Sequence, residues 1–309
     1  MGSRLIFIDG ISGSGKTSTG QFLYRQFLLN SLDVSFLHEF HIPHPIHEWN
    51  LTDPKEWIDV TLAHWRTFVD NMLASDKIVI MDSTLFQGTM GVLLELDVDR
   101  DTILNYALQV PDIIKPLHPA LIYFHQTDYR EALLKIYHER EERIRIKKDN
   151  YVQTIKYGQN RQLHGHEGYM HFVEELRDIS NELVSKYDIS KISIENSAGD
   201  WEDYHRQILQ FLSLPFVEDH VPLSDYAGKY RDTQSGRECR ISLNSDGELK
   251  ITGFFPVVKF LWPRSNDTLF IRGKAHELIF QRDGNGRVEK MISRWYIRES
   301  EETIWVKIE

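Results

Sequence analysis

Residues 10–17 carry the clearest chemical signal in the chain, the pattern Gly-x-x-x-x-Gly-Lys-Thr. Glycines let successive backbone N–H groups point inward and form a nest for an anion. In such a loop Lys16 would reach the β- and γ-phosphates of a nucleotide, and the Thr17 hydroxyl would contact Mg²⁺. The expected nucleotide-binding positions are Gly10, Ser12, Gly13, Ser14, Gly15, Lys16, Thr17 and Ser18.

The segments around this pattern match what phosphate binding requires. An apolar run at residues 5–9 predicts a buried strand that enters the loop, and residues 17–29 have the apolar spacing of a helix that leaves it. A helix that begins at the loop adds the positive end of its dipole to the anion site. A glycine-rich turn without a ligand could show the same letters, but the flanking strand and helix favour a phosphate loop.

Asp82 is the predicted acidic partner of the metal. The run 77–82 is apolar until it ends in this carboxylate, which is the form expected of the second metal-holding element of a nucleotide site. The alternative is an ordinary aspartate at the end of a strand that caps the next segment. We expect Thr17 and Asp82 to hold Mg²⁺ together.

Short apolar runs alternate with helical patterns through residue 212, which predicts an α/β domain with a five-stranded parallel sheet. Each predicted strand is rich in Ile, Val, Leu or Phe. The predicted strands are 5–9, 34–39, 77–82, 120–125 and 191–195. The predicted helices are 17–29, 54–74, 101–113, 129–147, 167–187 and 200–212.

The pattern changes at residues 214–223, which read as a linker. After it, short alternating runs at 240–243 and 248–251 are separated by turn signals at 245–247 and 283–286. We therefore expect two domains, residues 1–213 and 224–309. The second is predicted to be a small antiparallel β-barrel or sandwich.

Composition excludes several classes of protein. The 309 residues carry a formal net charge of -10, which disfavours binding to a nucleic acid polymer. No run of eighteen apolar residues predicts a membrane span, and the N-terminus lacks the features of a secretory signal. The single cysteine, Cys239, is expected to be a free buried thiol in a reducing compartment. These features together predict a cytoplasmic location.

The segment 8–18 resembles the first strand and phosphate loop of the nucleoside and nucleoside-monophosphate kinase superfamily, in particular its thymidylate kinase and deoxynucleoside kinase branch. The resemblance covers about the first 210 residues and implies a three-layer P-loop kinase fold. It also implies that Glu39, at the end of the second strand, lies at the acceptor site as a base or as a substrate ligand. The alternative for Glu39 is a loop cap or a partner of a lysine.

Two positions depart from the family pattern. The third strand ends in Asp82-Ser83-Thr84, without the arginine of the family's Glu-Arg-Ser motif, and the place of a base-reading glutamine is apolar near Leu62. Both departures weaken the expectation of a nucleoside acceptor.

The resemblance also implies a lid. Residues 137–145 look like the start of an arginine-bearing lid, and Arg140 and Arg143 would stabilise the transferring phosphate. A solvated helix face with Glu–Arg pairs explains residues 137–145 equally well. Residues 196–200 match the superfamily's adenine-binding loop, although a plain turn between a strand and a helix fits as well.

Histidines at positions 38, 41, 44 and 47 invite a metal-site interpretation. Pro43 and Pro45 rule out a regular helix there, so the spacing does not bring the rings to one face. A loop that lines the acceptor pocket is the preferred interpretation.

Taken together, the sequence predicts an enzyme that transfers the γ-phosphate of Mg·ATP to a small molecule such as a nucleoside, nucleotide, sugar or antibiotic. The expected catalytic residues are Lys16, Glu39, Asp82, Arg140 and Arg143. The alternatives are a nucleotide-dependent switch or ATPase that acts through the β-domain, and a kinase of macromolecules. A homodimer is left open.

Overall fold

The structure is a computed structural model that describes residues 2–138, 142–297 and 302–309, except for the side chain of residue 143. By compactness the chain divides into two units, which are described one at a time. The first comprises Met1–Lys16, Asp33–Glu39 and His44–Pro215. The second comprises Thr17–Leu32, Phe40–Pro43 and Phe216–Glu309.

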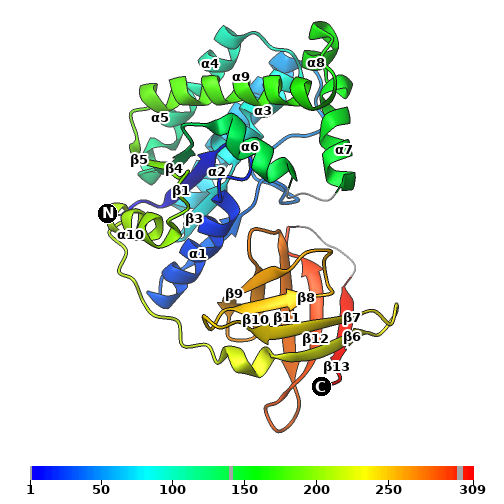
Figure 1. Cartoon of the computed structure of the whole chain (residues 1–309). Helices are drawn as coiled ribbons and strands as arrows, with labels where there is room; N and C mark the ends of the chain where they lie inside the picture. The colour runs from blue at the N-terminus through cyan, green and yellow to red at the C-terminus, as the bar shows by residue number, and fades with distance from the viewer. Residues whose placement is uncertain (1, 139–141, 298–301) are drawn as a thin grey trace. The chain divides into compact units, whose positions relative to one another are not determined.

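The first unit contains a parallel five-stranded sheet with the order β2-β3-β1-β4-β5 (Figure 1). This confirms the predicted sheet, and each predicted strand is present. The strands are β1 (Leu5–Gly10), β2 (Val34–Leu37), β3 (Ile78–Asp82), β4 (Ala120–His125) and β5 (Ser190–Glu195). Because parallel strands end at one edge of the sheet, their carboxyl ends gather the residues that follow them.

Helices connect the strands of this sheet, and α1, apart from its first residue, is assigned to the second unit. In the first unit α9 contacts α3, α4, α7 and α8, and Figure 1 shows it as a long helix. The helices are α1 (Lys16–Leu29), α2 (Pro54–Leu73), α3 (Met90–Glu95), α4 (Arg100–Ala107), α5 (Val110–Ile114), α6 (Tyr129–His138), α7 (Glu142–Tyr151), α8 (Lys156–Arg161), α9 (Gly165–Lys186) and α10 (Trp201–Phe211).

One helix prediction is wrong in its extent. The segment 101–113 was expected to be a single helix, but α4 ends at Ala107 and α5 starts at Val110. Pro111 lies in the first turn of α5, where its missing N–H has no intrahelical partner to lose. In the middle of one continuous helix the same ring would clash with the preceding turn.

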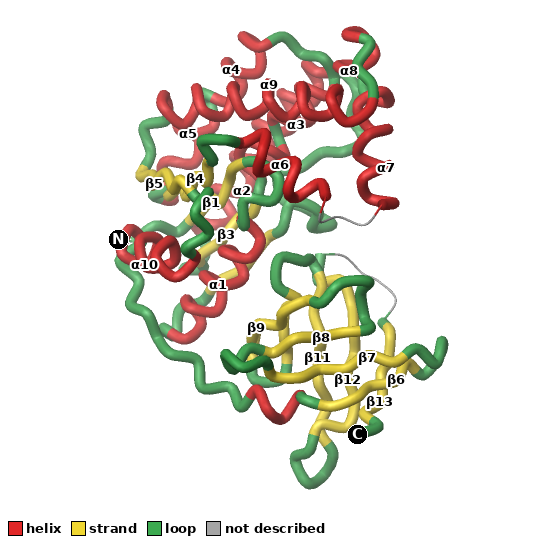
Figure 2. The backbone as a smooth tube through the Cα atoms, in the orientation of Figure 1, coloured by secondary structure: helices red, strands yellow, loops and turns green. Residues whose placement is uncertain are grey.

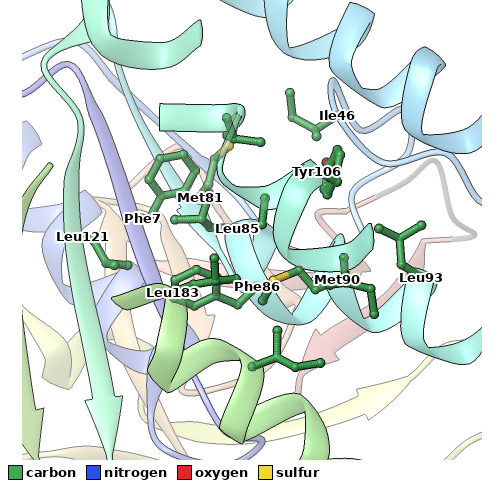
Figure 3. Close-up of a cluster of buried hydrophobic side chains, with 14 of the residues drawn as sticks. Phe7, Ile46, Met81, Leu85, Phe86, Met90, Leu93, Tyr106, Leu121 and Leu183 are labelled. Carbon is green, nitrogen blue, oxygen red and sulfur yellow. The ribbon is translucent and has the colours of Figure 1, made fainter. Parts of the chain in front are cut away.

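The core of the first unit forms where the sheet meets its helices. Figure 3 shows side chains from distant segments packed together, among them Phe7, Met81, Leu121 and Leu183. Phe7 and Met81 come from neighbouring strands that are paired in parallel register. These residues are fully buried, as expected for strands covered on both faces.

The strands of the second unit form a closed antiparallel barrel (Figure 2). Each strand pairs with the next, and β13 pairs with β6 to close the ring. The predicted second domain is therefore a barrel rather than a sandwich. Its strands are β6 (Gly228–Asp232), β7 (Glu238–Leu243), β8 (Leu249–Thr252), β9 (Lys259–Ser265), β10 (Thr268–Ile271), β11 (His276–Arg282), β12 (Val288–Trp295) and β13 (Thr303–Lys307).

Two predicted turns of the barrel are confirmed. Gly247 and Gly286 both have φ of +79°, a conformation that glycine adopts without strain. Cys239 is a free cysteine on β7 and is buried. Among the described helices, none has both the length and the apolar character that crossing a membrane requires.

Candidate functional site

The phosphate loop connects β1 to α1 and needs its glycines. Gly10, Gly13 and Gly15 have φ of +143°, +85° and +88°, which other residues rarely adopt. A Cβ at Gly10 would also collide with the backbone oxygen of Phe124 on β4. The turn is held by the Ser14 N–H, which donates to the Ile11 carbonyl at 3.2 Å.

Two side chains of the first unit lie against this loop. A Cβ on Gly13 would overlap Ile136 of α6, and a Cβ on Gly15 would overlap the indole of Trp201 at the start of α10. The loop therefore has packed neighbours on two sides, and neither glycine can be replaced without moving them.

Lys16 lies within a hydrogen-bonded group. Its ammonium donates to the Ile11 carbonyl at 2.8 Å and to Oε1 of Gln87 at 3.1 Å. The other end of the same amide, Gln87 Nε2, donates to Oε2 of Glu39 at 2.9 Å. A single side chain thus connects the predicted phosphate-binding lysine to the predicted acceptor-site carboxylate. Thr17 and Ser18 follow Lys16 directly as the next residues of α1.

Gln87 was not predicted from the sequence. It lies in a π-helical turn, Thr84–Gly88, that follows β3. The Asp9 carboxylate fixes this turn, because it accepts the N–H groups of Phe86 at 2.8 Å and Gln87 at 3.4 Å. The available signal was a polar residue close in sequence to Asp82 and directly after the apolar pair Leu85-Phe86.

Asp82 is fully buried at the end of β3. Its Oδ1 accepts the Ser83 hydroxyl at 2.7 Å, and Nε2 of His38 lies 3.9 Å from Oδ2. Burial lowers the pKa of His38, which favours the neutral ring. The Ser83 backbone has φ of +59°, an uncommon conformation for a residue with a side chain.

Neighbouring charges and burial perturb two carboxyl groups of the site. Burial, followed by repulsion from Asp82, raises the pKa of Glu39 to about 8, although Lys16 opposes the shift. The Glu39 residue as a whole is partly exposed, but protein atoms closely surround its carboxyl group. This loss of water disfavours the charged form of the carboxyl. Burial also raises the pKa of Asp9 to about 6, against the attraction of Lys16.

The predicted lid arginines are not tested by the structure. Arg140 lies outside the described residues, and so does the side chain of Arg143 on α7. Among the described cations of α7, Lys148 donates to the Tyr169 hydroxyl at 2.6 Å. Lys148 and Ser12 both line a cavity of about 10 Å³. Lys148 also lowers the pKa of Glu39, so its charge acts on the site.

The histidine-rich loop packs as a structural element. The rings of His44 and His47 stack with centroids 3.8 Å apart, and the N–H groups of Ile46 and His47 donate to Nδ1 of His44. Gly88 leaves the space that the His47 ring occupies. The described residues contain no group of His, Cys, Asp and Glu arranged to hold a metal ion.

The phosphate loop after β1 and the strand order of the sheet give the first unit the fold of a P-loop kinase. The chain is similar to the thymidylate kinase of Brachyspira hyodysenteriae (strain ATCC 49526 / WA1), with 24% identity over 214 residues that span 62% of this chain and 97% of that protein. The chain is thus similar to a thymidylate kinase over 62% of its length, and it carries an additional eight-stranded barrel in its C-terminal part.

Two solved structures are also similar. Thymidylate kinase from Ehrlichia chaffeensis has 17% identity and a TM-score of 0.40, covering 69% of this chain and all 100% of that one. The YorR protein of Bacillus subtilis, described as a complex with phosphorylated GDP, has 14% identity and a TM-score of 0.36, covering 70% and 99%. No family model matches the chain.

Proposed function

We propose that this protein is an ATP-dependent phosphotransferase that moves the γ-phosphate of Mg·ATP to a small-molecule acceptor. The observation that carries the proposal is the bridge from Lys16 through Gln87 to Glu39. It joins the expected phosphate-binding residue, which follows β1, to a carboxylate that follows β2, so a donor and an acceptor would meet there. A protein that only bound a nucleotide would need the lysine but not the carboxylate.

The proposed roles follow from these positions. The loop amides and Lys16 bind the phosphates of ATP and stabilise the charge that develops on them. Glu39 accepts the proton of the acceptor hydroxyl or orients it, and its raised pKa gives it affinity for that proton. Arg140 and Arg143 are the proposed lid residues that stabilise the transferred group, and Lys148 on α7 is a cation whose charge acts on Glu39.

The described residues hold no preformed cluster of metal ligands, so a magnesium ion would be held by the ATP phosphates and the buried carboxylate of Asp82. Oxygen ligands suit Mg²⁺, which keeps much of its water shell. Asp82 and the Thr17 hydroxyl are the predicted holders. When bound, the ion would neutralise charge on the phosphates during transfer.

The acceptor class is supported by the similarity to thymidylate kinase. We propose a nucleotide or nucleoside as the first class to test, with sugars and other hydroxylated compounds after it. Ser83 stands where related kinases carry an arginine, so the acceptor contacts differ from those of the deoxynucleoside kinases.

The test is incubation with γ-labelled ATP, Mg²⁺ and a panel of nucleoside monophosphates, nucleosides and sugars. Transfer of label to one class of acceptor is the expected result. Slow release of phosphate that no acceptor changes would overturn the proposal and favour a nucleotide-dependent switch.

A further inference from the structure

We propose that Asn196 is a positioning residue of the phosphate loop, which holds the Ser14 carbonyl so that the next amide, that of Gly15, faces the bound triphosphate. The proposal rests on the proposed function, because it assumes that the loop binds ATP. It assigns a role in the same unit to the segment that follows β5.

Asn196 is held in place by main-chain contacts. It is the first residue after β5, and its N–H donates to the His125 carbonyl at the end of β4 at 3.1 Å. The Gly199 N–H donates to the Asn196 carbonyl at 3.4 Å and closes the turn. The residue is only 4% exposed. Its side chain is therefore anchored to the sheet and not to a mobile surface loop.

The Asn196 side chain makes one described hydrogen bond, and that bond goes to the phosphate loop. Nδ2 donates to the Ser14 carbonyl at 2.7 Å. Oδ1 is buried and has no hydrogen-bond partner among the described residues. The Nδ2 group is therefore the part of the Asn196 side chain that interacts with the protein, and it stabilises the phosphate loop.

The hydrogen bond from Asn196 to the Ser14 carbonyl also fixes the direction of the Gly15 N–H, because both groups belong to one peptide unit. In a trans peptide the C=O and the following N–H point in opposite directions because the unit is planar. When Asn196, from the buried side, fixes the Ser14 carbonyl, the Gly15 N–H must point away from the protein interior. Backbone amides that face the bound anion in this way are what a phosphate nest consists of.

The same segment contacts the loop a second time. The Trp201 ring fills the space beside Gly15, and it is held by Phe124 at 5.9 Å and Tyr204 at 5.5 Å between ring centroids. Gly15 has φ of +88° and could otherwise rotate freely. Asn196 and Trp201 therefore restrain the two residues on either side of one peptide bond.

The experiment measures binding of Mg·ATP and of adenosine by calorimetry in the full chain and two variants. Asn196→Ala removes the donor, and Asn196→Asp keeps the shape but turns the donor into an acceptor. We expect Asn196→Ala to bind Mg·ATP about tenfold more weakly. The Ser14 carbonyl loses its hydrogen-bond donor, and the Gly15 N–H is then no longer held toward the phosphates. Asn196→Asp should bind still more weakly. Adenosine affinity should stay unchanged in both variants.

The matched control is Asn105→Ala, because Asn105 is an exposed asparagine on α4 in the same unit. It should bind both ligands like the unmodified protein. Equal Mg·ATP affinity in all variants would overturn the inference while leaving the proposed function intact. A parallel loss for adenosine would assign Asn196 a purely structural role. Absence of Mg·ATP binding in the unmodified chain would overturn the proposed function and this inference with it.

Discussion

Two glutamates, one in each unit, show how differently the protein treats buried negative charge. Glu277 on β11 is 1% exposed and accepts hydrogen bonds from the guanidinium groups of Arg264 and Arg294, the latter at 2.8 Å. Glu39 accepts from the neutral amide of Gln87 and is repelled by Asp82. The barrel neutralises its buried charge, whereas the α/β unit leaves carboxylates in excess. Buried carboxyl groups that lack a cationic partner have raised pKa values, and such groups are typical of sites that bind cations or move protons.

The largest expected effect is on stability, when the two arginines that pair with Glu277 are removed. Arg264→Met together with Arg294→Met leaves the Glu277 charge buried without a partner. We expect the unfolding free energy to fall by about 3 kcal/mol, as when a buried ion pair loses one side. Denaturant unfolding followed by tryptophan fluorescence measures it.

Adding Glu277→Gln to this double variant should recover most of the lost stability, because the buried charge is then gone. Nucleotide binding measured below the unfolding transition should stay unchanged. A folded double variant that no longer binds Mg·ATP would contradict the structural role of this cluster.

The next prediction concerns the α/β unit. Lys16→Ala should reduce turnover on the order of a hundredfold or more, because one strong electrostatic contact to the phosphates is lost. Initial rates with the acceptor found in the labelled-ATP panel measure it. The control is Lys55→Ala, since that side chain is 89% exposed. Near-normal turnover in a folded Lys16→Ala protein would contradict the site.

The raised pKa of Glu39 predicts a pH dependence of activity. A base must lose its proton to act, so kcat/KM should rise with pH by about tenfold per unit and level off above a pH of about 8. Glu39→Gln should be slow and should lack this rise. A profile already flat from pH 6 would show that Glu39 is a ligand and not the base.

The same shift predicts a dependence of stability on pH. The folded state holds the Glu39 proton more tightly than the unfolded state, where the pKa is near 4.5. This contribution to stability is complete below that value and is lost as pH rises through about 8. Glu39→Gln should therefore lose less in melting temperature between pH 6 and pH 9 than the unmodified protein. Equal losses would contradict the shift.

The smallest expected effect belongs to the bridge. Gln87→Leu removes hydrogen bonds to both Lys16 and Glu39 and should lower kcat/KM by about tenfold. Gln153→Leu, on an exposed residue, is the control. If Gln87→Leu matched the control, the bridge would play no part in transfer.

The features predicted well from the sequence are those set by local chemistry. The phosphate loop needs glycines and a lysine within eight residues, and Asp82 needs only a buried strand before it. At the start of α2, Asp53 accepts the Glu56 N–H at 2.8 Å, a contact over three residues. Such features depend on residues that are close together in the sequence, so they can be recognised from it directly.

The features that were missed depend on distant partners. Gln87 lies 71 residues from Lys16, and Asn196 lies 182 residues from Ser14. No local pattern tells a polar side chain which distant atom it will meet. The choice of barrel over sandwich has the same origin, because closure depends on the pairing of the first and last strands of the tail.

That closing pair has a consequence for how such a protein could have been assembled. The Lys229 N–H donates to the Glu309 carbonyl at 3.3 Å, and the Ile308 N–H donates to the Lys229 carbonyl at 2.8 Å. The start and the finish of the barrel are therefore neighbours in space. A domain with adjoining ends can be inserted into another chain without separating the residues on either side of the insertion point.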